Sequence, residues 1–286
     1  MISGNTRVRN ALDINRQQRL AADIARAQTQ ISSGKRLLAP SDDPAAAARI
    51  AEIGRGQADA AVWLQNVESA ASLSSSADTA LSGVSSSLDR AKELMLSATN
   101  GTASADNRSA IATELRSIAG EVDGFAATTD FRGAALFSDA APLAIPVGKN
   151  VSIAPVDSKA NIFGSVPTAG GPQSISAILD AAASAIELAD PAARAAAGQA
   201  SLAALDSASG HVATAHAEQG LRAQRLDTLR NRFNDAAVNA TEERQGLEST
   251  DVTEAVARLQ SKQITLQAAQ AVYAQLNKST LFDLLK

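Results

Sequence analysis

The chain has 286 residues and a formal net charge of only −4 at pH 7, so no global field favours nucleic acid. It contains no cysteine, which excludes disulfides and thiolate metal sites, and aromatic residues make up only 3%, which argues against base-stacking surfaces and aromatic-lined pockets. No apolar run of about 18 residues occurs, and the polar N-terminal stretch lacks the apolar region of a Sec-type signal peptide. We therefore expect neither a membrane protein nor a nucleic-acid binder.

The first expected element is an N-terminal helix with one apolar face. Leu20, Ile24 and Ile31 recur at helical spacing and form a stripe along this segment. The stretch after it, "SGKRLLAPSDDP", changes from basic to acidic and predicts an elbow between two helices. Pro40 and Pro44 restrict its backbone, and Asp42 or Asp43 can cap a helix that begins at Pro44. Two adjacent acids beside prolines are more typical of a turn than of a catalytic pair.

Two long spans, 45–141 and 192–286, contain no proline, and proline breaks helix interiors. We expect a helix over about 45–98, a second one after the turn "TNGTASADN", and a long returning helix from 192. The stripe of the 45–98 helix is interrupted by polar residues, and so is the stripe of the returning helix. The interrupting residues are Gln57, Ser74, Asp78, Ser85, Gln219 and Arg222.

Between the long spans, residues 138–172 hold short apolar runs separated by turn residues, which predicts a small β-hairpin or meander. We expect this insert to be peripheral and to tolerate deletion. A short helix is expected over 174–189.

The last helix carries a heptad seam, the pattern of a coiled coil. Lys262 is the one flaw in this seam. Its members are Val252, Leu259, Leu266 and Tyr273, with Leu276 beside them. The seam predicts that the two chain ends pair with each other.

The predicted fold class is therefore mainly α, a long antiparallel helical rod with paired terminal coiled-coil helices and a small β insert. We divide it into paired terminal helices (1–36 and 250–286), a helical rod domain (37–137 and 173–249) and the insert (138–172). Each isolated end has an apolar seam but no further neighbours, so we expect both ends to be largely disordered in the free monomer and to fold on assembly.

Residues that carry chemistry are sparse. His211 and His216 are the only histidines, and a spacing of five places them on different helix faces, so they make a poor metal pair. No acid–base or nucleophile cluster supports catalysis, and we expect no catalytic residue, metal or cofactor. The first 36 residues hold seven basic and two acidic residues, which suits a solvated or subunit-contacting face better than a nucleic-acid arm.

Several stretches resemble the bacterial flagellins and their hook-associated relatives. "QISSGKRLLAPSDDPAAAARIAEI" at 30–53 looks like the N-terminal signature of that family, and "LDRAKELMLSATNGTASADNRSAIATEL" at 88–115 is similar to its next conserved stretch. "HVATAHAEQGLRAQRLDTLRNRF" at 211–233 resembles the returning helix. The ending "STLFDLLK" and the elbow are most like the hook–filament junction type (hook-associated protein 3).

The resemblance implies a structural axial component of the flagellum at the junction between hook and filament. Implied partners are further copies in a ring, a neighbour of the hook-associated protein 1 type, flagellin, and a cytoplasmic chaperone that holds the C-terminal seam before type III export. The implied location is extracellular, on the flagellum. In flagellins an innate receptor reads the surface that matches 88–115, where Arg90, Leu94 and Glu114 stand here.

Two alternatives stay open at this point. The chain could be a flagellin that polymerises into the filament, which would be present in thousands of copies instead of one ring per flagellum. The chain could also be a cytoplasmic coiled-coil adaptor, which would need neither export nor paired ends. An enzyme is the least supported class, because the sequence contains no cluster of catalytic residue types.

Overall fold

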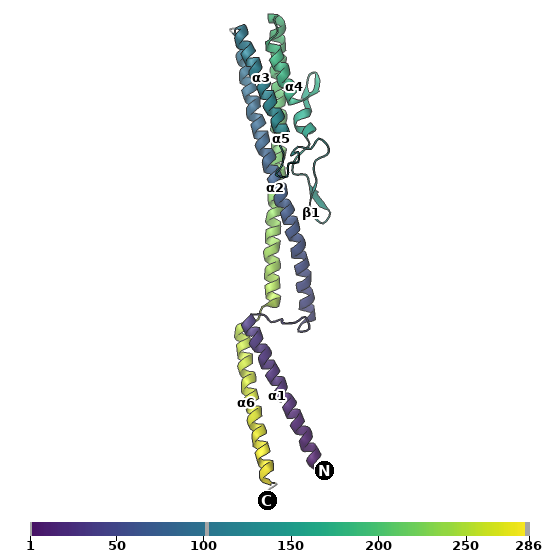
Figure 1. The fold of residues 1–286 in the computed structure, drawn as a ribbon, viewed down its shortest axis with the longest axis vertical. Coiled ribbons are helices and arrows are strands. Elements are labelled where there is room, and N and C mark those ends of the chain that lie inside the picture. The colour runs from purple at the N-terminus through teal and green to yellow at the C-terminus, as the bar shows by residue number, and fades with distance from the viewer. Residues whose placement is uncertain (1, 101–102, 284–286) are drawn as a thin grey trace. The chain divides into compact units, whose positions relative to one another are not determined.

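The computed structural model of the protein describes residues 2–100 and 103–283, except for the side chains of residues 2–7, 9, 10 and 276–283. It is mainly α-helical, which confirms the expected fold class (Figure 1). The helices are α1 (Ile2–Ser33), α2 (Pro44–Thr99), α3 (Ala105–Ala126), α4 (Ile175–Ile186), α5 (Pro191–Glu248) and α6 (Val252–Asp283).

Side-chain caps begin the shorter helices where the sequence places small polar residues. The Ser104 hydroxyl accepts a hydrogen bond from the Asn107 N–H at the start of α3, and the Ser174 hydroxyl accepts one from the Ala177 N–H at the start of α4. These oxygens satisfy donors that have no partner within the first turn of a helix.

The chain packs as two units, and each is described by itself. The first unit comprises residues 1–58 and 237–286, and the second comprises residues 59–236. These limits fall inside α2 and α5, whereas the sequence placed its boundary at the two connectors. The three-part division of the chain into terminal helices, rod and insert stays a prediction.

The second unit has one large hydrophobic core in which α3 packs along α4 and against α2 and α5. Leu115 and Val122 of α3 are almost fully buried in it. Gly83 of α2 lies against the Phe125 ring, and a Cβ at this glycine would come within 2.5 Å of that ring. Alanine at position 83 would therefore force the Phe125 ring to move.

The insert is not peripheral, which corrects the expectation from its turn-rich sequence. It forms two separate antiparallel hairpins, β1 (Ile145–Gly148) with β2 (Val151–Ile153) and β3 (Val166–Thr168) with β4 (Gly171–Gln173). A single π-helical turn, η1 (Ala160–Gly164), lies between them. The insert buries apolar side chains against the helices, so its deletion would open the core. These side chains are Val147, Ile153, Val156, Ile162, Phe163 and Val166.

Most of the polar interruptions of the two long stripes form hydrogen bonds or ion pairs with the other long helix or with the insert. In the second unit, the buried Gln219 amide donates to the Ser74 hydroxyl at 2.7 Å and to the Pro155 carbonyl at 2.8 Å. His216 Nε2 lies 2.8 Å from an Asp78 carboxylate oxygen. In the first unit, Gln57 donates to the Thr241 hydroxyl at 3.2 Å. Because each polar group finds its partner at only one alignment, these pairs specify the register of α2 against α5.

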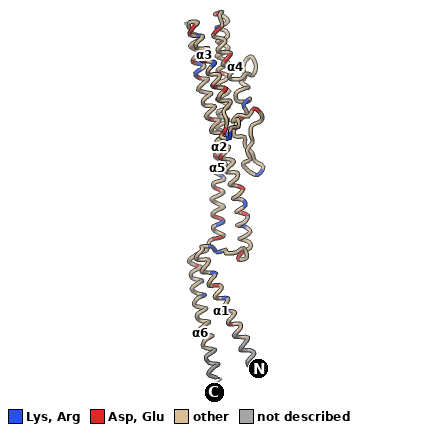
Figure 2. Tube along the Cα trace, in the orientation of Figure 1, with Lys and Arg blue, Asp and Glu red and all other residues tan. Residues whose placement is uncertain are grey.

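Acidic and basic residues are interspersed along α2, α3 and α5 (Figure 2). Within the part of the chain that the structure describes, no helix is both long and apolar enough to cross a membrane.

Candidate assembly surfaces

The elbow between α1 and α2 is organised by its two aspartates. Asp42 accepts hydrogen bonds from the N–H groups of Leu38 and Ala39, both at 3.0 Å, which closes the turn around Pro40. Asp43 accepts one from the Ala46 N–H at 3.1 Å and is therefore the residue that caps α2, with Pro44 in the first position.

Both elbow carboxylates are stabilised in their charged form. The backbone N–H groups of Ala39 and Leu38 lower the pKa of Asp42, and the Ala46 N–H lowers the pKa of Asp43. Arg26 of α1 also reaches Asp42 at 2.9 Å, which ties the elbow to the first helix. The two acids thus shape a turn, as their proline neighbours suggested.

The two connectors of the first unit run side by side. The Arg36 N–H donates to the Glu248 carbonyl at 2.7 Å, and the Thr250 N–H donates to the Gly34 carbonyl at 3.0 Å. Gly34 has a φ of +68°, a left-handed conformation that glycine adopts without strain. The sequence did not indicate this pairing, because the two connectors are more than 200 residues apart.

The terminal helices α1 and α6 pack along each other (Figure 1). On α1, Leu20, Ile24 and Ile31 are half-buried, and on α6 so are Leu259, Leu266 and Tyr273. Lys262, the expected flaw in the seam, is also half-buried, and its ammonium lies 2.6 Å from the Asp23 carboxylate. The hydrogen bond from Lys262 lowers the pKa of Asp23, so the flaw is a cross-helix ion pair.

One member of the predicted seam lies outside the contact between α1 and α6. Val252 is 49% exposed as the first residue of α6, and Ala255, 2% exposed, begins the packed face. The side chain of Leu276 lies outside the described residues.

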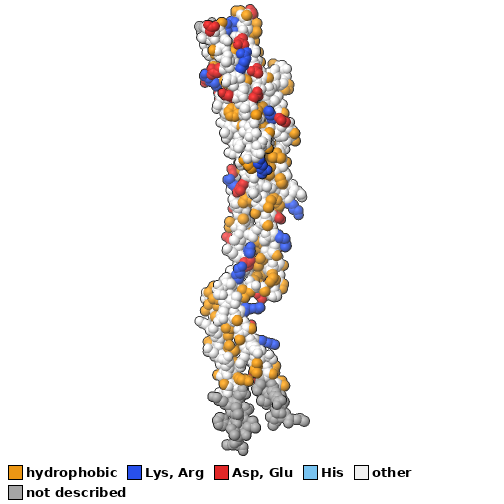
Figure 3. Space-filling model, in the orientation of Figure 1, with side chains coloured by type: hydrophobic (Ala, Val, Ile, Leu, Met, Phe, Trp, Pro, Cys, Tyr) orange, Lys and Arg blue, Asp and Glu red, His pale blue; other side chains and the backbone are white. Residues whose placement is uncertain are grey.

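The paired terminal helices leave large apolar side chains exposed away from the seam, and Figure 3 shows hydrophobic atoms at the surface of this region. Ile264 and Val272 of α6 are 66% and 57% exposed, and Leu12 of α1 is 63% exposed. Between residues 259 and 275 of α6 the only charged side chain is Lys262, which faces α1. An uncharged outer face with exposed apolar residues is typical of a surface that another chain covers.

The expected receptor-like surface is only partly a surface. Arg90 of α2 and Glu114 of α3 are exposed and form an ion pair at 2.8 Å, and this carboxylate raises the pKa of Arg90. Leu94 is only 6% exposed and belongs to the core of the second unit, so its placement on that surface is wrong. Its side chain packs into the hydrophobic core that α2 forms with α3, α4 and α5.

The two histidines have separate structural contacts. His211 lies 2.8 Å from the Asn161 carbonyl of the insert, and His216 pairs with Asp78 of α2. Among the described residues, no three His, Cys, Asp or Glu side chains gather as a metal site.

Two family models cover most of the chain. Residues 2–141 match the bacterial flagellin N-terminal helical region, and residues 202–285 match the bacterial flagellin C-terminal helical region. The chain therefore belongs to the bacterial flagellin family, whose two conserved regions correspond here to α1–α3 and to most of α5 with α6.

Within that family, the full-length similarity is to hook-associated proteins. The chain is 27% identical to flagellar hook-associated protein 3 of Escherichia coli over 289 residues, covering 90% of this chain and 91% of that protein. Against E. coli flagellin the identity is 32% over 142 residues, which covers 48% of this chain and 27% of that protein. The chain is thus a component of the flagellum. It matches the hook-associated relative over nearly the whole length of both chains.

A solved structure shows the same fold. The flagellar junction protein FlgL of Legionella pneumophila superposes with a TM-score of 0.57 at 15% identity, over 70% of this chain and 100% of that one.

Proposed function

We propose that this protein is the structural component that joins the flagellar hook to the filament. The match to hook-associated protein 3 over nearly all of both chains supports this role over that of a flagellin, which the chain matches over about half its length. The central insert is also short, so the chain lacks the large outer domain that many flagellins carry.

The observation that carries the proposal is the surface of the terminal pair. The seam between α1 and α6 uses one face of each helix, while Leu12, Ile264 and Val272 stay exposed on others. Neighbouring copies in a ring would bury these side chains, and that burial is the free-energy source for assembly.

We further propose that the two ends fold together as subunits join the assembly. Helices in proteins gain most of their stability from packing, and the α1–α6 pair buries only one face of each helix, so an unassembled subunit would stay threadable during type III export and would not polymerise early. Its partners on this view are other copies in a ring, a neighbour of the hook-associated protein 1 type and flagellin. A cytoplasmic chaperone would cover the C-terminal seam before export to the extracellular flagellum.

Immunogold labelling of isolated flagella tests the location. A single label at the boundary between hook and filament is the expected result. Label along the whole filament would identify a flagellin, and isolated flagella without any label would favour an adaptor.

Truncation after residue 249 tests the role of the ends. The truncated protein should keep the folded second unit, and cells that carry it should make hooks without attached filaments. Normal filaments on such cells would remove the terminal helices from the mechanism.

A further inference from the structure

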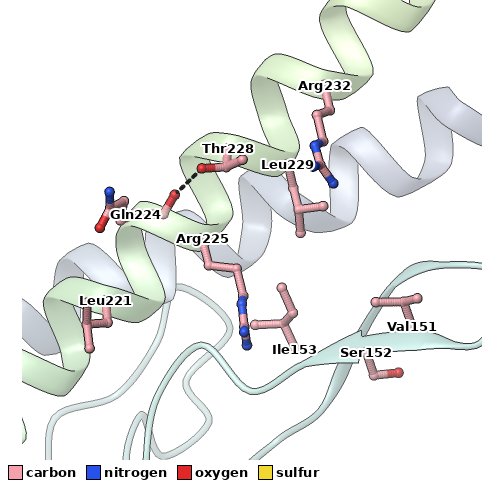
Figure 4. Close-up of a pocket in the computed structure, with 9 residues that line it drawn as sticks. All are labelled: Val151, Ser152, Ile153, Leu221, Gln224, Arg225, Thr228, Leu229 and Arg232. Carbon is pink, nitrogen blue, oxygen red and sulfur yellow. Dashed lines mark hydrogen bonds between the residues drawn. The ribbon is translucent and has the colours of Figure 1, made fainter.

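A groove of about 470 Å³ lies on the second unit between the β2 strand and one face of α5 (Figure 4). Its apolar part includes Val151 and Leu221, which are 50% and 67% exposed. Its strand side includes Ser152, which stands opposite Pro146 in the β1–β2 ladder.

The charged part of the groove is two arginines, Arg225 and Arg232, and no acidic side chain lines it. Figure 4 shows Arg225 reaching from α5 toward β2. Within the described chain neither arginine forms an ion pair, whereas the nearby Arg222 and Arg230 are both paired with carboxylates. Seven residues separate Arg225 from Arg232, which is about 10 Å along one side of a helix.

The outer face of α3 has the complementary properties. We define this α3 outer face as the exposed residues between 110 and 124 on the side of α3 away from the core. Most of its side chains are small, and two acidic residues lie along one edge of it. Its members are Ala110, Thr113, Glu114, Ser117, Gly120, Glu121 and Gly124.

The glycines of this face have no explanation within their own unit. A Cβ added at Gly120 or Gly124 would meet nothing within 4 Å. Glycine inside a helix is nevertheless less stable than alanine, by about 1 kcal/mol. A face without side chains lets another backbone or large apolar side chains approach closely.

The spacing of the charges also agrees. Glu114 and Glu121 are seven residues apart on α3, as Arg225 and Arg232 are on α5. The charges of the surrounding segments are also opposite in sign. Residues 59–130 hold ten acidic and four basic residues, whereas residues 219–234 hold one acidic and four basic residues. Such complementary surfaces favour one docking orientation and suppress others.

We propose that the groove between β2 and α5 binds the α3 outer face of a second copy of this chain. Val151 and Leu221 would lie on the glycine surface, and the two arginines would pair with Glu121 and with Glu114, the latter shared with Arg90 of its own copy. The contact is head-to-tail, since different faces of the two copies meet, and it would repeat around an assembly. This inference rests on the proposed ring of copies and names its lateral contact.

The two surfaces cannot meet within one copy. Glu114 of the α3 outer face lies beside Arg90 of α2, whereas Ile153 of the groove packs with Val67. These α2 positions are 23 residues apart, which is about 35 Å along a helix.

Disulfide cross-linking tests the contact in assembled flagella. Because the chain has no native cysteine, any disulfide between copies must involve the introduced residues. Ser117→Cys on the α3 outer face is combined with Thr228→Cys in the groove, and isolated flagella are oxidised with copper phenanthroline. We expect covalent dimers and longer oligomers from the double variant. Each single variant should stay monomeric, because a head-to-tail contact does not bring a residue against its own equivalent.

Two controls sharpen the result. The pair Ser184→Cys with Thr228→Cys replaces the α3 position by an exposed position on α4 and should give no oligomers. Adding Arg225→Glu and Arg232→Glu to the first pair should lower the cross-linked yield about tenfold or more. The melting temperature of that variant should be unchanged, since neither arginine has a partner within the described chain.

Immunogold labelling of the same flagella separates the possible failures. Label at the hook–filament boundary without oligomers overturns this contact and leaves the proposed function intact. Dimers from a single variant, equal yield from the α4 control, or a cross-link to a different protein also overturn it. Label anywhere else overturns the proposed function, and this inference with it.

Discussion

The core of the second unit and the pair of terminal helices bury their apolar residues to very different degrees. Leu115 of α3 is fully buried among side chains from several elements, whereas Leu259 of α6 has only α1 beside it and is half-buried. A core residue with neighbours on all sides stabilises its own fold, while a two-helix seam leaves each residue partly in water. We infer that the second unit is stable by itself and that the ends depend on neighbouring chains.

The largest expected effect is a charge placed in the core. Leu115→Asp buries a carboxylate without a partner and should lower the free energy of unfolding by about 4 kcal/mol. Thermal unfolding followed by circular dichroism measures it, with Leu115→Met as the volume-conserving control. An unchanged melting temperature would mean that this face of α3 is exposed in solution.

A smaller loss is expected at the buried amide. Gln219→Ala leaves the Ser74 hydroxyl and the Pro155 carbonyl without their donor and should lower the free energy of unfolding by about 2 kcal/mol. Urea denaturation measures the change. Gln224→Ala, at an exposed position five residues later on α5, is the control and should be near neutral.

The matched change in the terminal pair should separate stability from assembly. Leu259→Asp should change the free energy of unfolding of the isolated protein by less than about 1 kcal/mol, because the half-buried seam contributes little to the second unit. Filament attachment should nevertheless be lost, as counted by electron microscopy of the cells. A destabilisation as large as that of Leu115→Asp would abolish the distinction between the two regions.

The smallest expected effect is a pH dependence in the second unit. Burial raises the pKa of Asp157, but hydrogen bonds from the Ser158 N–H and Asn161, together with Arg222, outweigh it, so the pKa lies below its ordinary value. A lowered folded-state pKa stabilises the protein above the unfolded-state pKa of about 4, and this contribution is lost as the pH falls through the folded-state value.

Asp157→Asn should therefore reduce the difference in the free energy of unfolding between about pH 6 and about pH 3 by less than about 1 kcal/mol. Urea titrations of both proteins at the two pH values measure it. An equal pH dependence in the variant would show that other carboxylates account for the whole effect.

Local sequence patterns predicted the helices well. Proline-free spans with a 3-4 apolar rhythm become α2 and α5, and the Asp-Pro elbow becomes a capped turn, because both signals depend only on residues within a few positions of each other. The sequence did not show that the Leu94 side chain faces the core and not the surface. That depends on the neighbouring helices, which cover it.

The sequence by itself determined the helices, their breaks and the family. Only the tertiary structure decided what the polar interruptions and the insert do. Ser74 and Gln219 read as defects in two separate stripes, yet they form one buried hydrogen bond across 145 residues of chain. The insert reads as a surface loop, yet its Ile153 and Val156 complete the hydrophobic cores. The periodicity of apolar residues shows which face of a single helix is apolar. Whether a residue is buried, and which polar group it pairs with, depends on the distant segment that lies opposite it in the folded chain.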